Sequence, residues 1–202
     1  MNPIASIRYR LRQRRRRVPA ERHWVRIVMD REVERLLRAL GPAGLHAAEI
    51  SGSGRSHLGW QSFTRLDYPD FDLVHPRQVG QFDVVVCEQV LEHVTQPFTA
   101  VATLAQLVRP GGHVLVSVPF LLRVHEAPID AWRFSPTGVR LLLESSGLEV
   151  LEVGSWGNPW CVRANLLEWA PFSWHHRLLS RRSLANHPDT PLVVWALARA
   201  TG

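Results

Sequence analysis

The sequence contains no lysine, so each of its 24 basic side chains is an arginine, and the formal net charge is +6. A P-loop requires a lysine after its last glycine, because that side chain reaches the phosphates of the bound nucleotide. The missing lysine therefore excludes a P-loop anywhere in this chain, including at its one glycine-rich turn.

Cysteine and long apolar runs are also scarce. Cys87 and Cys161 stand in no Cys-x-x-Cys motif, and no Cys/His cluster has metal-ligand spacing. We therefore expect no metal and a reducing, cytoplasmic compartment. No run of about 18 uncharged apolar residues could cross a bilayer, and the basic N-terminus lacks the apolar stretch that a secretory signal needs.

The first residues form a basic segment, with RYRLRQRRRR at positions 8–17. Its apolar content is too low to anchor it in a core, so we expect a flexible arm over residues 1–18 and one domain over 19–202. The arm can contact nucleic acid or the anionic inner surface of a membrane, or it can be a solvated tail. Apolar residues at helical spacing then predict an amphipathic helix over 21–40.

From residue 45 onward, short apolar runs alternate with helical patterns. This alternation predicts an α/β fold, with a doubly wound and largely parallel sheet. The expected strands are 45–51, 62–68, 71–75, 82–88, 113–120, 148–156 and 191–199, and the expected helices are 97–108, 135–147 with Ser135 as N-cap, and 161–170. The last of these helices lies in a tryptophan-rich insertion, about 156–187. Ligands of such sheets bind at the carboxyl ends of the strands.

The glycine-rich turn AAEISGSGRS, residues 47–56, follows the first of these strands. A dinucleotide-binding turn would read Gly-x-Gly-x-x-Gly, but His57 stands in place of the third glycine, and Glu49 would repel a pyrophosphate. S-adenosylmethionine (SAM) has no phosphate and carries a sulfonium cation, so a nearby carboxylate favours it. Asp67, 18 residues after Glu49, lies close to the spacing of an acid that reads a ribose, with Asp70 and Asp72 as competitors.

Four stretches resemble class I SAM-dependent methyltransferases: AEISGSG, FDVVVCEQVLEHVTQPF, LAQLVRPGGHVLVSVPF and HEAPIDAWRFSPTGVRLLLESSGLEV. The resemblance covers roughly residues 45–155 and 191–199. It implies a Rossmann-like sheet of seven strands with the last one antiparallel, helices on both faces, and SAM as cofactor with S-adenosylhomocysteine as product. The residues that it implies at the cofactor are Glu49, Ser51, Gly52, Ser53, Gly54, Asp67, Glu88, Gln89, Val90 and His93. Arg55 departs from the family pattern, which has a small residue there.

The acceptor side is expected after the strand 113–120, in PFLLRVHEAPIDAWRFSP. His125 is the candidate base, because its pKa is naturally close to a working pH. Asp130 and Arg133 complete the candidate catalytic set. Glu126 or Asp130 could orient His125 or contact the substrate. Arg133 could hold an anionic acceptor group or pair with Asp130. The alternative is that these residues only shape the loop.

These features predict a SAM-dependent methyltransferase that O-methylates a small-molecule, glycan or lipid-linked acceptor. Two alternatives remain open at this point: an RNA or protein methyltransferase that uses the arginine-rich arm, and a non-catalytic member of the fold. The strand end CEQVLEH does not carry the Asn/Asp-Pro-Pro-Tyr/Phe motif of methyltransferases that act on base amino groups. The oligomeric state is not predicted.

Overall fold

The structure of the chain is a computed structural model that describes residues 24–125, 129–167 and 184–201. The predicted arm, Glu126 and the expectation for residues 168–183 of the insertion lie outside these residues. The helices are α2 (Trp24–Ala39), α3 (Pro97–Leu107), α4 (Pro136–Glu144) and α5 (Pro159–Leu167), with 3-10 turns η2 (Ser56–Leu58) and η3 (Leu91–His93). The strands are β1 (His46–Ile50), β2 (Ser62–Leu66), β3 (Phe82–Glu88), β4 (Val108–Pro119), β5 (Leu148–Trp156) and β6 (Val193–Ala200).

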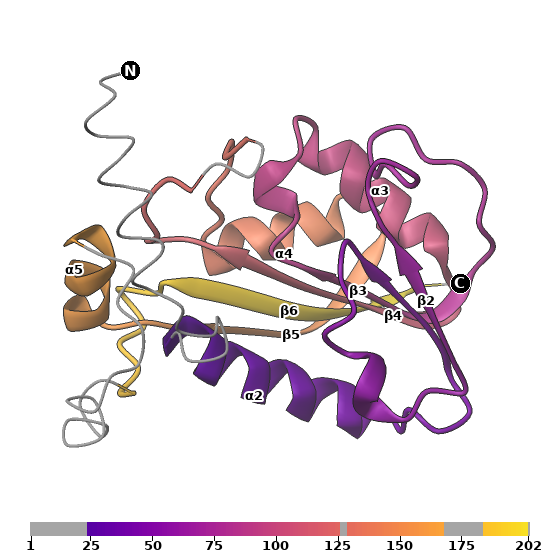
Figure 1. Cartoon of the computed structure of the whole chain (residues 1–202), viewed down its shortest axis with the longest axis horizontal. Coiled ribbons are helices and arrows are strands. Elements are labelled where there is room, and N and C mark those ends of the chain that lie inside the picture. The colour runs from indigo at the N-terminus through magenta and orange to yellow at the C-terminus, as the bar shows by residue number, and fades with distance from the viewer. Residues whose placement is uncertain (1–23, 126–128, 168–183, 202) are drawn as a thin grey trace, which may run out of the picture.

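The strands form one mixed sheet in the order β2-β1-β3-β4-β6-β5 (Figure 1). The pairs β1–β2, β1–β3 and β3–β4 are parallel, whereas β6 runs antiparallel to both β4 and β5. The α/β class and the antiparallel last strand are therefore confirmed. Within the described residues the sheet has six strands instead of the seven expected.

The missing strand is the one expected at residues 71–75, which form bends and irregular backbone instead. Phe71 and Leu73 are buried, as their apolar character suggested. However, Oδ1 of Asp72 accepts a hydrogen bond from the N–H of Val74 at 2.8 Å, which closes a local turn. The apolar alternation of this segment thus reflects burial of single side chains and not pairing with the sheet.

Helices cover both faces of the sheet (Figure 1). Valines of β3 alternate between two hydrophobic clusters, with Val84 and Val86 facing α2, and Val85 in the cluster under α3 and α4. This two-sided burial explains why the β3 sequence is a continuous apolar run. Among the described residues, no helix combines the length and the apolar character needed to cross a membrane.

Of the expected boundaries, the start of α4 is confirmed and the start of β4 differs. Ser135 caps α4, because its hydroxyl accepts the N–H of Gly138 at 3.1 Å, as expected for an N-cap. The strand expected from residue 113 begins five residues earlier, at Val108, where its backbone already pairs with Phe82 before a register shift. Both cysteines are free thiols, buried in the core.

Candidate functional site

Four parallel strands, β2, β1, β3 and β4, end at the same edge of the sheet. The segments that follow these strand ends therefore lie close together, and they contain the predicted site residues. Two non-glycine residues with positive φ, Ser51 after β1 and Gln89 after β3, mark this edge. A positive φ is uncommon outside glycine and often occurs at functional turns.

The glycine-rich turn after β1 is held by the carboxylate of Glu49, which is only 4% exposed. Its Oε1 accepts the N–H of Gly54 at 3.0 Å, and its Oε2 accepts the N–H of Arg55 at 2.9 Å. Burial raises the pKa of Glu49, and these two backbone donors oppose the rise. Glu49 thus fixes the path of the turn, while Ser51, Ser53 and Gly54 stay exposed on it.

Gly52 is required by the same carboxylate. A Cβ atom at this position would lie 2.4 Å from Oε1 of Glu49, well inside van der Waals contact. At Gly54 the corresponding distance is 3.6 Å, an ordinary contact. The shape of the turn therefore depends on the missing side chain at Gly52 much more than on that at Gly54.

Arg55, the departure from the family pattern, is buried at the centre of an ion cluster. Its Nε lies 2.5 Å from Oε1 of Glu88 and its Nη2 lies 2.8 Å from Oε2, a two-pronged pair in which both side chains are at most 7% exposed. The same Nη2 lies 2.6 Å from Oδ1 of Asp30, in α2. Arg55 therefore ties the turn to the end of β3 and to α2.

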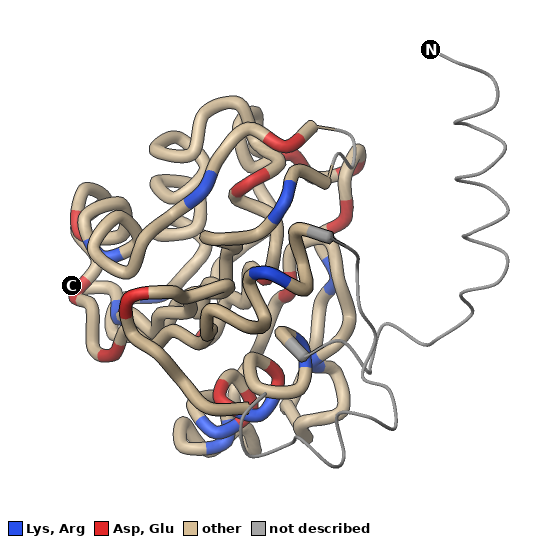
Figure 2. The backbone as a smooth tube through the Cα atoms, turned by 90° about the vertical axis from the view of Figure 1, so that its left-hand side faces the viewer, with Lys and Arg blue, Asp and Glu red and all other residues tan. Residues whose placement is uncertain are grey.

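These carboxylates change the charge balance at the turn. Burial lowers the pKa of Arg55, but the hydrogen bonds and charges of Glu88 and Asp30 outweigh burial and raise it above its usual value. Figure 2 shows that acidic and basic positions lie close together around the helix at the bottom of the view, which is α2. The charge of Arg55 is neutralised within this cluster, so it does not oppose a cation bound at the turn.

Asp67 follows β2, the neighbour of β1, and its side chain is 39% exposed. It forms an ion pair with Arg65 at 2.6 Å, where both partners face solvent. A pair this exposed is weak and is readily exchanged for another partner. Of the competing acids, Asp72 is used in the turn described above and Asp70 stands three residues further along the chain, so Asp67 is the carboxylate directly after β2.

The end of β3 presents backbone and amide groups. The N–H of Gln89 donates to the carbonyl of Ser117 at 2.8 Å, and its side-chain amide lies 3.4 Å from the Ser117 hydroxyl. Val90 packs against the core cluster under α3 and α4. Three residues were expected to line the floor of the cofactor site. Glu88 is paired with Arg55, which leaves Gln89 and Val90 as the candidates to line the floor.

The turn η3 follows directly and carries Glu92 and His93. Glu92 is fully buried, and neither of its carboxylate oxygens has a hydrogen-bond partner. Burial raises the pKa of Glu92 to about 7. Nδ1 of His93 lies 2.5 Å from the carbonyl oxygen of Ile129. His93 therefore faces the segment after β4, where the acceptor side was predicted.

That segment is organised around Asp130, whose side chain is 1% exposed. Asp130 accepts two hydrogen bonds from the guanidinium of Arg133, of which Nη2–Oδ2 measures 2.6 Å, and one from the N–H of His125 at 2.6 Å. The hydrogen bonds of Arg133, together with the N–H of His125 and the charge of Arg133, outweigh burial, which acts in the opposite direction, and bring the pKa of Asp130 to about 2. Nδ1 of His125 lies 3.3 Å from Oδ2 of Asp130.

Arg133 is committed to this segment. Its guanidinium also donates to the carbonyls of Leu122, Arg123 and Trp132. Its nitrogens are therefore engaged within the protein, which disfavours the alternative that Arg133 holds an anionic group of the acceptor. Burial lowers the pKa of His125, Asp130 opposes this, and His93 adds to it. The candidate catalytic residues His125, Asp130 and Arg133 are thus brought together, with Arg133 as an organising residue.

Three hydrogen bonds fasten the segment after β4 to the residues of η3 and Val94. The N–H of Ala131 donates to the carbonyl of Glu92 at 2.8 Å, and the indole of Trp132 donates to the carbonyl of Val94, also at 2.8 Å. The contact between His93 and Ile129 is the third. As a result, the rings of His93 and His125 meet edge to face with centroids 5.2 Å apart.

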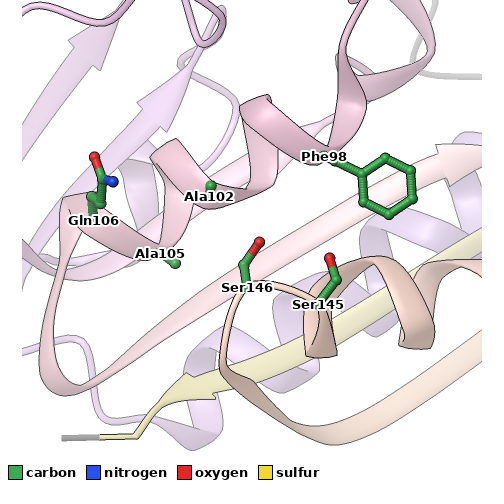
Figure 3. Close-up of a pocket in the computed structure, with 6 residues that line it drawn as sticks. All are labelled: Phe98, Ala102, Ala105, Gln106, Ser145 and Ser146. Atoms are coloured by element: carbon green, nitrogen blue, oxygen red, sulfur yellow. The ribbon is translucent and has the colours of Figure 1, made fainter.

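A separate hollow of about 420 Å³ lies between α3 and the end of α4 (Figure 3). Its lining contains no ionisable side chain: Phe98, Ala102, Ala105, Gln106, Ser145 and Ser146. It offers no carboxylate for a sulfonium ligand and no base for an acceptor. The strand ends, and not this hollow, therefore form the candidate active site.

A family model described as a methyltransferase domain matches residues 30–186. The chain belongs to this methyltransferase family. The resemblance to class I SAM-dependent methyltransferases is thereby confirmed, and structures support the same fold. The SAM-dependent methyltransferase of Mesorhizobium loti superposes with a TM-score of 0.55 at 15% identity, covering 82% of this chain and 96% of that one.

A second solved structure is the 1,6-didemethyltoxoflavin-N1-methyltransferase of Burkholderia thailandensis, with bound S-adenosylhomocysteine. It gives a TM-score of 0.57 at 13% identity, covering 91% of this chain and 85% of that one. Identities this low establish the fold of the methyltransferase and leave its substrate undetermined.

Curated relatives share more sequence over a shorter length. The ubiquinone biosynthesis O-methyltransferase of Aromatoleum aromaticum is 39% identical over an aligned length of 93, and the alignment covers 41% of this chain and 38% of that protein. Its counterpart in Thiobacillus denitrificans is 41% identical over 80 residues, 40% of this chain and 30% of that protein. The chain thus spans about a third of the length of these relatives.

Proposed function

We propose that this methyltransferase transfers a methyl group from SAM to an oxygen atom of a small-molecule, glycan or lipid-linked acceptor. The observation that carries the proposal is the pair of acids at adjacent strand ends: Glu49 beneath an exposed glycine-rich turn, and Asp67 one strand away. The names of the curated relatives support transfer to oxygen.

The turn fits the cofactor in shape and charge. Its backbone is open at Ser51, Ser53 and Gly54, and the space at Gly52 is kept by Glu49. We assign the amino-acid end of SAM to this turn, the ribose to Asp67, and the floor of the site to Gln89 and Val90. Glu88 and His93 act through neighbours, Arg55 and the segment after β4, respectively. The bound cofactor would supply a methyl group on its positively charged sulfonium, and the sulfur would leave as a neutral thioether.

On the acceptor side, we assign His125 to take the proton of the acceptor hydroxyl. Asp130 positions the imidazole, because it accepts the backbone N–H of His125 and its carboxylate lies 3.3 Å from Nδ1 of the ring. Arg133 in turn holds Asp130. A base placed in this way contributes about 10²–10⁴-fold to the rate, and alignment of the hydroxyl with the methyl group supplies roughly 7–11 kcal/mol.

Two substitutions separate the cofactor side from the acceptor side. Asp67→Ala removes hydrogen bonds to a charged group, each worth about 1.5–3 kcal/mol, so SAM affinity should fall by about tenfold to a hundredfold. His125→Ala should keep SAM affinity and slow turnover. Calorimetric titration with SAM and S-adenosylhomocysteine measures the first effect, and methyl transfer to a hydroxyl acceptor measures the second.

Arg65→Ala is the matched control, because it removes the exposed partner of Asp67 and should leave SAM affinity unchanged. Equal SAM affinity of wild type and Asp67→Ala would show that the ribose assignment is wrong. If the folded wild-type protein gives neither heat nor a thermal shift with SAM or S-adenosylhomocysteine, the proposed enzymatic function fails.

The arginine-rich arm is a separate part of the proposal. We assign it to contacts with an anionic surface, because its charge exceeds what its apolar content could bury. Deletion of residues 1–18 should leave SAM affinity unchanged and reduce binding to vesicles that contain anionic lipid. Calorimetry and vesicle co-sedimentation measure the two effects, and loss of SAM binding on deletion would contradict this assignment.

A further inference from the structure

Glu92, His93 and His125 converge on one point. Each offers a possible metal-ligand atom, and these three atoms all lie within 4.8 Å of one another. Glu92 and His93 come from η3, whereas His125 comes from the segment after β4. The hydrogen bonds that fasten this segment to η3 and Val94 keep the three side chains together.

Glu92 is the unusual member of this group. A carboxylate that is fully buried is costly unless it is paired, hydrogen-bonded or coordinated to a metal. Neither oxygen of Glu92 accepts a hydrogen bond, and the nearest ion-pair partner is Nε2 of His93, 3.7 Å from Oε1. Burial outweighs the groups that lower the pKa of Glu92, which are its own backbone N–H and the charges of Arg133 and Arg26. Among the described residues, none of these groups forms a hydrogen bond or ion pair with its carboxylate. The surrounding protein therefore leaves both oxygens for another ligand.

The imidazole of His93 is held as metal-binding histidines are usually held. Such a histidine donates one ring N–H to a carbonyl or carboxylate, which fixes the ring and directs the second nitrogen to the metal. His93 places Nδ1 on the carbonyl of Ile129, and its Nε2 faces Glu92. Nδ1 of His125 lies 3.3 Å from Oδ2 of Asp130, a charge contact whose geometry is not that of a hydrogen bond, so a bound ion would have to improve the alignment of this ring.

We propose that Glu92, His93 and His125 form a binding site for a divalent transition-metal cation. Two imidazoles and one carboxylate suit Zn²⁺ or Fe²⁺, whereas Mg²⁺ and Ca²⁺ prefer oxygen ligands alone. Ligand atoms around a tetrahedral Zn²⁺ lie about 3.3 Å apart, given bonds of about 2.0–2.1 Å. The three atoms lie within 4.8 Å of one another, so they would draw closer around a bound ion, and three protein ligands leave further coordination positions open.

The site departs from the expectation of no metal, which was based on spacing along the chain. The ligands stand at positions 92, 93 and 125, too far apart for a local motif. It also goes beyond the proposed methyl transfer. A cation there would bind the acceptor hydroxyl and lower its pKa, and this is a second way to ionise the oxygen that His125 otherwise deprotonates.

The test is a titration of the full chain, without a histidine tag and after dialysis against a chelator, with Co²⁺ and Zn²⁺. We expect one Co²⁺ per chain, with the absorption bands of a nitrogen- and oxygen-ligated ion, and displacement by Zn²⁺ in calorimetry. Glu92→Gln keeps the shape of the side chain and removes its charge. Loss of a residue that only hydrogen-bonds a metal ligand costs about 10–100-fold in metal affinity, so loss of a ligand should lower Co²⁺ affinity by on the order of 100-fold. His125→Asn should have the same effect.

Two controls address the other histidines. His57→Ala removes an exposed histidine that pairs with Glu34, and the double variant His175→Ala/His176→Ala removes the adjacent pair in the insertion. Both should bind Co²⁺ as the wild type does. Circular dichroism checks that each variant is folded, and His93→Gln replaces any variant that is not.

The proposal is overturned if the wild type binds no Co²⁺ or Zn²⁺ at micromolar concentrations, or if the folded Glu92→Gln and His125→Asn variants bind them unchanged. The titration contains no SAM, so its outcome is independent of the proposed methyl transfer. Conversely, a protein that binds Co²⁺ but not SAM would retain the metal site and refute the enzymatic proposal. If the protein binds both Co²⁺ and SAM, methyl transfer is measured with and without a chelator. Turnover that stops in chelator and returns with Zn²⁺ or Fe²⁺ assigns ionisation of the acceptor to the cation. Turnover that persists in chelator assigns it to His125.

Discussion

Gly52→Ala should destabilise the protein by about 2–4 kcal/mol and weaken SAM binding by on the order of 100-fold. The added Cβ would lie 2.4 Å from Oε1 of Glu49. That oxygen ends a flexible side chain, but it can move away only by giving up its hydrogen bond to Gly54, and with it the alignment of the bond to Arg55. Hydrogen bonds to a charged group are worth about 1.5–3 kcal/mol each. The turn would then lose the path that presents its backbone to the cofactor.

Gly54→Ala is the matched control, two residues away in the same turn. Its Cβ would lie 3.6 Å from the same oxygen, in ordinary contact, so its stability should change by less than about 1 kcal/mol. Urea unfolding measures the stability of both variants, and calorimetry measures their SAM affinity. Equal stability of the two variants would show that Glu49 does not set the conformation of the turn.

The parts of the fold that carry the site could be predicted because their signals are local. The buried run Phe82–Glu88 is long and rich in β-branched residues, so it indicated a strand covered on both faces, as found. The strand expected at residues 71–75 was wrong because a short apolar alternation also arises where single side chains are buried. There the carboxylate of Asp72, a local competitor for the backbone, decides the conformation.

The site itself could be predicted only in part, for a related reason. Glu49 and Asp67 follow adjacent strands, so the fold class alone brings them to one edge. The partners of Arg55 and the surroundings of Glu92 depend on contacts between distant segments. Glu88 stands 33 residues and Asp30 25 residues from Arg55. Arg55 stood out in the sequence because it breaks the pattern of small residues, and its burial with carboxylates explains why the turn tolerates it.

Arg55→Ala should lower the free energy of unfolding by about 3–5 kcal/mol, more than any other substitution proposed for this protein. The substitution leaves Glu88, 7% exposed, as a buried carboxylate without its cation. Removal of one partner of a buried pair costs this much because the other charge stays desolvated. Asp30 would also lose its contact with the turn, so α2 would be released from the end of β3. Urea unfolding at neutral pH measures the loss.

Arg38→Ala is the comparison, because Arg38 forms an exposed pair with Glu34 on the same helix that supplies Asp30. Such pairs contribute about 0–1 kcal/mol, so this variant should unfold nearly as the wild type does. The double variant Arg55→Met/Glu88→Gln removes both buried charges and should recover most of the loss, since the desolvated carboxylate is then absent. A double variant as unstable as Arg55→Ala would place the effect of Arg55 in its packing, and not in its pairing with Glu88.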